Sequence, residues 1–157
     1  MIKLDSDFSI LRQVEDFKLI ELKLKSVDQL SPETWILNLQ DINGEKSINI
    51  AADIGQLTYI LFGLSKTVKL SLSPSVYQLV AALCKYNKMK MKSVIIDHVE
   101  ENMSKAKLEI ANQEKIIYFD IATGDAIALA YINNIPVYVI ANLLDDNTEN
   151  MIEIDLE

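Results

Sequence analysis

The chain has 157 residues, half of them hydrophobic and 24% charged, which is enough for one domain with a sizeable apolar core. Only four glycines and three prolines exclude collagen-like and low-complexity structure. The single cysteine, Cys84, excludes an intramolecular disulfide and is typical of a reducing compartment. No apolar run begins the chain, and no stretch approaches the roughly 20 apolar residues of a membrane helix. We therefore expect a cytoplasmic protein with no membrane partner.

Acidic residues are concentrated at the C-terminus. Residues 144–157 hold six of the 23 acids and no base, whereas the other 143 residues carry 17 acids and 15 bases. This pattern predicts a solvated acidic tail over residues 146–157, with competition against nucleic acid as an alternative role. Arg12 is the one arginine, which argues against a sequence-specific DNA reader, because arginine is the usual residue for guanine recognition. The argument does not extend to a nuclease, since a bound metal can supply positive charge.

The first half of the chain predicts three strands and a helix. Apolar and polar residues alternate over 17–25, 34–40 and 45–50, and Asn43-Gly44 predicts a turn before the third strand. Apolar residues then recur at helical spacing up to Phe62, and we expect Gly63 to end this helix.

The second half predicts the same order of elements. Its strands are expected at 92–98, 105–111 and 115–121, with a helix over 125–132 that Asn133 and Asn134 end. A last strand over 136–140 matches 67–72 in the first half. Between the halves, residues 76–87 predict a bridging helix with Ser73 as its cap and Pro74 at its first position. Cys84 lies on this helix and is expected in the core.

A shift of 71 residues superposes the two halves without a gap. We interpret residues 17–72 and 88–143 as an internal duplication within one domain over 17–145. Two such units predict an α+β fold, in which one mixed sheet or open barrel has helices packed against it. Residues 1–16 lie outside the repeat, and their apolar residues, spaced as on one helical face, predict a short docking helix.

The only histidine, His98, follows Asp97 and precedes Glu100. Such side chains can bind a metal or transfer protons, so their clustering suggests a metal-binding or catalytic site. In a strand, however, His98 and Glu100 share one face while Asp97 and Val99 share the other. A solvated strand end is therefore the favoured interpretation, with proton transfer by Asp97 or His98 as the functional alternative.

Asp120 and Asp125 lie on either side of the junction between the last repeat strand and its helix. Spacing alone favours Asp125 as a helix cap that also benefits from the helix dipole. The functional alternative is that both carboxylates hold Mg²⁺ or Mn²⁺, whose preferred ligands are oxygens. A metal-bound hydroxide could then attack a phosphodiester.

Lysine and methionine alternate over residues 88–92, which places Lys88, Lys90 and Lys92 on one face of a strand. These lysines form the best candidate surface for the phosphate backbone of DNA or RNA. The favoured structural alternative is that they guard an edge strand against aggregation.

One segment carries a family resemblance. Residues 119–130 read FDIATGDAIALA and 135–139 read IPVYV, and both resemble the bifunctional nuclease domain family, which typically has Arg-Pro-Ser-Asp-Ala-Ile-Ala-Leu-Ala and then a Pro-Ile-Tyr-Val strand. Residues 45–62 and 94–97 fit more loosely. The resemblance implies an α+β, homo-oligomeric domain, with plant relatives that degrade DNA and RNA. Two departures concern the chemistry: Ala122-Thr123-Gly124 replaces Arg-Pro-Ser, and Ile54 occupies an acidic position, with Asp53 beside it.

Two functional hypotheses follow. The first is a metal-assisted nuclease of broad specificity in which Asp120 and Asp125 bind Mg²⁺ or Mn²⁺, Asp97 or His98 assists proton transfer, and the lysines position phosphate. The second is a non-catalytic, homo-oligomeric interaction or regulatory module on the same fold.

Overall fold

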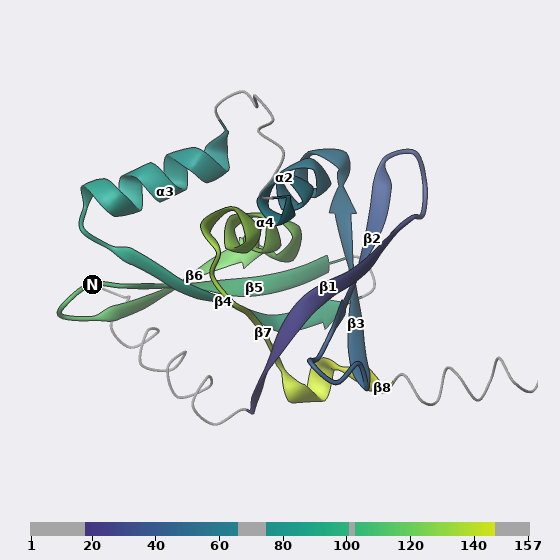
Figure 1. Cartoon of the computed structure of the whole chain (residues 1–157). Coiled ribbons are helices and arrows are strands. Elements are labelled where there is room, and N and C mark those ends of the chain that lie inside the picture. Colours follow the sequence, from purple (N-terminus) through teal and green to yellow (C-terminus); the bar gives the residue numbers. More distant parts are fainter. Residues whose placement is uncertain (1–17, 66–74, 101–102, 147–157) are drawn as a thin grey trace, which may run out of the picture.

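In the part of the chain that the structure describes, a mixed sheet carries three α-helices on one side (Figure 1). The computed structural model describes residues 18–65, 75–100 and 103–146. Its elements are β1 (Leu19–Gln29), β2 (Thr34–Gln40), β3 (Lys46–Asp53), α2 (Ile54–Leu64), α3 (Val76–Tyr86), β4 (Lys90–Glu100), β5 (Met103–Ala111), β6 (Ile116–Ala122), α4 (Thr123–Asn133), β7 (Val137–Ile140), the 3-10 helix η1 (Ala141–Leu143) and β8 (Asp145–Asp146). The predicted α+β fold class is confirmed, and the sheet is not closed into a barrel.

The strands lie in the order β6-β5-β4-β7-β1-β2-β3-β8. Two antiparallel units of three consecutive strands therefore flank β7, which runs antiparallel to β1 and parallel to β4. The two-residue strand β8 pairs with the start of β3, so the predicted acidic tail begins as a short sheet strand. This topology brings the two halves of the chain together in one sheet.

Each half has three strands followed by a helix, and β1 and β4 begin 71 residues apart, as the proposed repeat requires. The agreement concerns element order, and the duplication itself stays a prediction. The expected strand over 67–72, the helix within 1–16 and most of the acidic tail lie outside the described residues.

Alternating burial on the strands explains the core. Leu37 and Leu39 of β2 are fully buried, as are Val94 and Ile96 of β4, because these side chains face the helices. Helix α4 is apolar nearly all round, and a run of small and aliphatic residues from Ala126 to Ala130 is buried. Cys84 is buried in the same core, as expected. Among the described helices, none has the length and hydropathy needed to cross a membrane.

The helix boundaries correct two predictions and agree with a third. Gly63 lies inside α2 rather than after it, and Ser65 is the C-cap. A Cβ at Gly63 would lie 2.5 Å from the backbone of Tyr131, so glycine permits the close approach of α2 to α4. Helix α3 begins after Ser75, not Ser73, because Ser75 and Gln78 form a capping box. The end of α4 is as predicted, with Asn134 in the left-handed conformation (φ 54°).

Candidate functional site

Asp125 lies in the first turn of α4 and is bound by two side chains from other helices. Its Oδ1 accepts a hydrogen bond from Gln56 Nε2 at 3.0 Å and another from the Tyr77 hydroxyl at 2.6 Å. The predicted capping role is wrong, because Ala122 is the N-cap of α4 and the carboxylate bonds to α2 and α3 instead. The negative charge still lies at the positive end of the α4 dipole.

Gln56 connects this carboxylate to the start of α2. Its Oε1 accepts a hydrogen bond from the Asp53 backbone N–H at 3.0 Å, and Asp53 Oδ1 accepts one from the Gln56 backbone N–H at 2.7 Å. This capping box fixes the Gln56 side chain, whose amide then donates to Asp125. The first turns of α2 and α4 are thereby joined through side chains.

Tyr77 is held in place by Tyr59 as well as by Asp125. The two rings pack edge to face with centroids 5.1 Å apart. Burial, then the hydrogen bond to Asp125 and the charges of Asp125 and Asp53, raise the pKa of Tyr77 well above its ordinary value. The phenol therefore stays protonated and acts as a hydrogen-bond donor to Asp125.

These residues border a pocket of about 450 Å³, which we call the Asp125 pocket. Of the described residues that line it, Asp53 and Asp125 are acidic, and α2, α3, β6 and α4 all contribute to its wall. Val80, Ile121 and Leu129 form an apolar part of that wall. An apolar pocket with a few convergent polar groups is the usual form of a small-ligand site.

Asp97 and Asp120 do not line the Asp125 pocket, and both form an ion pair with a lysine whose interaction with them was not predicted. Lys107 of β5 pairs with Asp97 at 3.6 Å and also pairs with Asp120 of β6. Ile121 packs against the core and lines the Asp125 pocket, so the preceding residue, Asp120, points to the other face of the sheet. The structure therefore brings Asp97 and Asp120 together and separates them from Asp125.

His98 lies near the end of β4, where its Nε2 is 3.0 Å from Glu100 Oε1 on the same face of the strand. Both side chains are about half exposed, in agreement with the favoured solvated strand end. His98 and Asp97 are absent from the wall of the Asp125 pocket. In the part of the chain that the structure describes, no three His, Cys, Asp or Glu residues converge as metal ligands.

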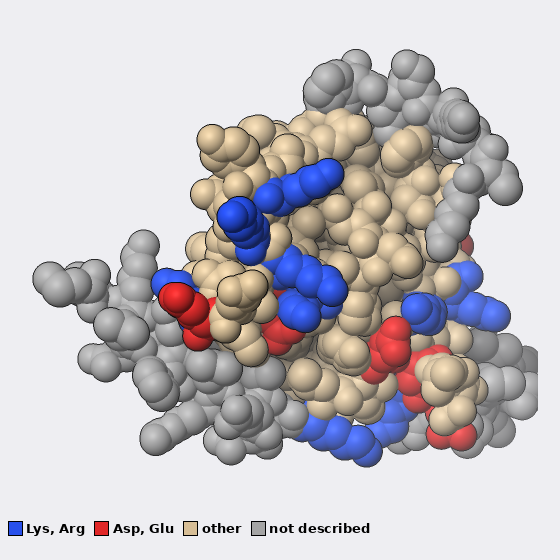
Figure 2. Space-filling model, turned by 60° about the vertical axis from the view of Figure 1, so that its left-hand side comes forward, with Lys and Arg blue, Asp and Glu red and all other residues tan. Residues whose placement is uncertain are grey.

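The three predicted phosphate-binding lysines are exposed at the start of β4. Lys88 precedes the strand with φ 55°, Lys90 begins it, and Lys92 is the extra residue of a β-bulge. Lysines gather on this side of the molecule, which α3 and the start of β4 form (Figure 2). Strand β4 lies between β5 and β7, but among the described residues β7 pairs only with residues 94–96. The start of β4 therefore pairs with β5 alone, and the edge-strand interpretation of these lysines stays a prediction.

A family model described as the bifunctional nuclease domain matches residues 37–151, most of the chain. The chain belongs to this family. No curated protein matches it. Because the match extends over residues 37–151, the bifunctional nuclease domain includes the capped start of α2, the whole of α3 and the β6–α4 junction. These segments together form the Asp125 pocket.

Sequence reasoning found Asp125 of this bifunctional nuclease domain but missed Gln56 and Tyr77. The spacing Asp53-x-x-Gln56 is a capping-box pattern and could have indicated the start of α2. Tyr77 is 48 residues from Asp125, and no local pattern predicts which face of α3 will meet α4. The contact depends on helix packing over the sheet.

Proposed function

We propose that this protein is a nuclease that hydrolyses phosphodiester bonds of DNA and RNA, with its reaction centre in the Asp125 pocket. Membership of the bifunctional nuclease domain family supports the class of activity. The observation that carries the proposal is the Asp125 carboxylate, fixed by Gln56 and Tyr77 at the wall of a pocket that also contains Asp53.

The donor atoms of the pocket suit a divalent cation that keeps much of its water. Mg²⁺ is commonly held by one or two carboxylates with water completing its shell, and Mn²⁺ accepts similar oxygen ligands. Asp125 and Asp53 would hold the ion, since the described bonds use only Oδ1 of each carboxylate. When bound, such an ion supplies a Lewis acid and lowers the pKa of water.

The chain's own residues orient the proposed reaction centre. Tyr77 and Gln56 donate to the same oxygen of Asp125, Oδ1, so Oδ2 would be the oxygen that holds the ion. Because the pKa of Tyr77 is raised, this donor stays protonated across the physiological range. The exposed lysines at the start of β4 would attract the nucleic acid backbone.

The direct test incubates the purified full chain with single- and double-stranded DNA and RNA, with Mg²⁺, Mn²⁺ or EDTA. We expect cleavage that EDTA abolishes and that Asp125→Asn lowers at least 100-fold, the scale of losing one charged catalytic group. Asp28→Asn, an exposed carboxylate on β1, is the matched control and should cleave normally. Absence of cleavage by the wild type under every condition would refute the proposal.

A further variant distinguishes two arrangements of the centre. Asp120→Asn removes the carboxylate that pairs with Lys107 on the opposite face of the sheet. If the reaction centre is the Asp125 pocket, this change should have a much smaller effect than Asp125→Asn. Loss of cleavage in Asp120→Asn with normal activity in Asp125→Asn would support a centre at Asp97 and Asp120 instead.

A specific feature favours a second candidate function, a homo-oligomeric interaction module. The outward face of α3 exposes Val76, Leu79, Leu83 and Tyr86, of which Tyr86 is 87% exposed. Their spacing forms one apolar stripe along the helix, as expected for a surface that a second copy covers. Light scattering should then report an oligomer that Leu79→Glu with Leu83→Glu converts to a monomer, whereas Asn43→Glu in an exposed turn should not. A monomeric wild type would refute this candidate.

A further inference from the structure

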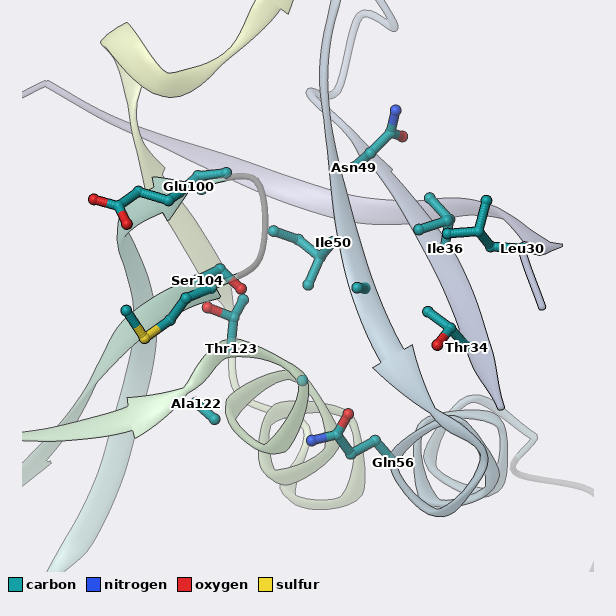
Figure 3. Close-up of a pocket in the computed structure, with 14 residues that line it drawn as sticks. Leu30, Thr34, Ile36, Asn49, Ile50, Gln56, Glu100, Ser104, Ala122 and Thr123 are labelled. Atoms are coloured by element: carbon teal, nitrogen blue, oxygen red, sulfur yellow. The ribbon is translucent and has the colours of Figure 1, made fainter. Parts of the chain in front are cut away.

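A second pocket, of about 610 Å³, lies where the two halves of the sheet approach each other at the start of α4 (Figure 3). Three hydroxyl side chains line it, from Thr34 of β2, Ser104 of β5 and Thr123 of α4, and we call it the hydroxyl pocket. Ile36 and Ile50 form part of its apolar wall. Its size suits a small organic ligand with one polar group.

The start of α4 opens on this pocket without a side-chain cap. Ala122 is the N-cap and makes no side-chain hydrogen bond, whereas Asp53 caps α2 and Ser75 caps α3. The first N–H groups of an α-helix have no partner within the helix, and their end of the helix dipole is positive. Ala122, Thr123 and Gly124 all line the pocket, so these groups are available to an anion there.

Thr123 provides an independent indication of a ligand. The residue is 1% exposed, and its Oγ1 is a buried polar atom with no hydrogen-bond partner among the residues that the structure describes. Its side chain forms part of the pocket wall and extends from α4 toward Ser104 (Figure 3). Buried hydroxyls are normally satisfied because an unpaired one costs free energy, so a polar ligand atom is a natural partner.

The charges around the pocket limit the kind of anion. Among the described residues that line it, none is a lysine or arginine and the one charged residue is Glu100, which pairs with His98. Positive potential therefore comes from the helix terminus, which is equivalent to about half a charge. Asp125, in the same first turn, binds Gln56 and Tyr77 on the side of the other pocket. Such a site suits a single oxyanion group attached to an apolar group.

We propose that the hydroxyl pocket binds a phosphate ester. Its phosphate oxygens accept hydrogen bonds from the Thr123 hydroxyl and from the N–H groups that begin α4, and its organic part lies against Ile36 and Ile50. A tetrahedral oxyanion accepts donors from several directions, which a hydroxyl and a helix terminus together supply. The inference goes beyond the proposed nuclease activity and does not require cleavage.

The test follows backbone amide signals by NMR while inorganic phosphate or phenyl phosphate is added to the metal-free full chain at constant ionic strength. We expect saturable shifts of residues 123–126 and tighter binding of phenyl phosphate than of inorganic phosphate. Acetate is the comparison for a non-specific anion. Absence of saturable shifts, or equal binding of acetate and both phosphates, would overturn the proposal.

Variants of Thr123 separate binding from folding. Thr123→Val should weaken phosphate binding about tenfold, the usual effect of losing one charge-assisted hydrogen bond. Because it removes an unpartnered buried hydroxyl, this variant should melt at or above the wild-type temperature without ligand. Thr123→Ser should retain most binding, and Thr58→Val, which removes a hydroxyl bonded within α2, is the matched control. Wild-type affinity in Thr123→Val would refute the role of the hydroxyl.

Two further variants are informative. The first tests how the charge of Glu100 affects anion binding, and the second tests whether phosphate binding is independent of the proposed nuclease activity. Glu100→Gln should strengthen phosphate binding, since it removes the negative charge at the pocket; weaker binding would contradict the proposed orientation. Asp125→Asn should lower cleavage at least 100-fold yet retain phosphate binding. If binding fails in the wild type while cleavage persists, only the hydroxyl-pocket proposal is wrong.

Discussion

At the scale of single residues, Tyr77 shows how packing defines the chemistry of Asp125. A phenol in water loses its proton near pH 10, but burial and the neighbouring carboxylates raise the pKa of Tyr77 in the folded protein. The protein therefore binds this proton more tightly folded than unfolded. The resulting stability is complete below about pH 10 and is lost as pH rises above it.

Tyr77→Phe tests this linkage. At neutral pH it removes the hydrogen bond to Asp125 and should lower the free energy of unfolding by about 1 kcal/mol. Above about pH 10 the wild type should lose stability more steeply than the variant, because only the wild type carries the shifted phenol. Urea unfolding between pH 7 and 11 measures both effects. Tyr86→Phe, at an exposed position, is the control, and parallel pH profiles for wild type and Tyr77→Phe would contradict the argument.

Residue types were easier to predict than their partners. The sequence indicated Asp125 because a carboxylate near a helix start is recognisable locally, but the sequence suggested a cap or a pairing with Asp120. In the structure Asp120 pairs with Lys107, and the acceptor atom of Asp125 is used by Gln56 and Tyr77. These contacts join elements 48 and 69 residues apart, so they depend on tertiary packing that local patterns do not contain.

At the scale of elements, the approach of α2 to α4 positions the Asp125 pocket. The Gln56 side chain lies against Gly124, where a Cβ would meet its atoms at 2.4 Å, and Gly63 lies against the α4 backbone at the other end of α2. Small residues at both ends of the contact allow the helices to pack closely. The strands were predicted well from their alternating apolar and polar residues, because one face of each strand is buried. The observed helix ends differ from the predicted ones by a few residues, because the wrong residues were taken as caps.

Gly63→Ala should therefore separate the two helices. Its Cβ would lie 2.5 Å from Tyr131 C and 2.6 Å from Tyr131 O, which are backbone atoms that cannot rotate away. We expect a loss of about 1–3 kcal/mol in the free energy of unfolding. In the same helix Gly55→Ala would meet only the Asp53 side chain at 3.2 Å and is the matched control, with little loss or a gain from higher helix propensity. Equal unfolding midpoints for the two variants in urea would refute the packing argument.

At the scale of the whole molecule, charge is distributed unevenly over the sheet. The chain carries a net charge of −8, yet exposed lysines lie together at the α3–β4 side, while β8, at the far edge of the sheet, consists of Asp145 and Asp146. Composition predicted only that acidic residues follow the lysines along the chain. Because β8 lies beside β3 at the edge of the sheet and β4 lies in its interior, Asp145 and Asp146 are also separated in space from the lysines at the start of β4.

The lysines at the start of β4 predict salt-dependent binding of nucleic acid. Each lysine that neutralises a phosphate lowers the slope of log affinity against log salt by about 0.7 for single strands and 0.9 for duplexes. Changing Lys88, Lys90 and Lys92 together to glutamine should therefore reduce the magnitude of the slope by about 2–3 if all three contact phosphate. Fluorescence anisotropy at several salt concentrations, in an Asp125→Asn background, measures it without cleavage. Glutamine at the exposed Lys18, Lys25 and Lys46 is the matched control, and an equal reduction in both triple variants would mean that binding is spread over the surface rather than located at β4.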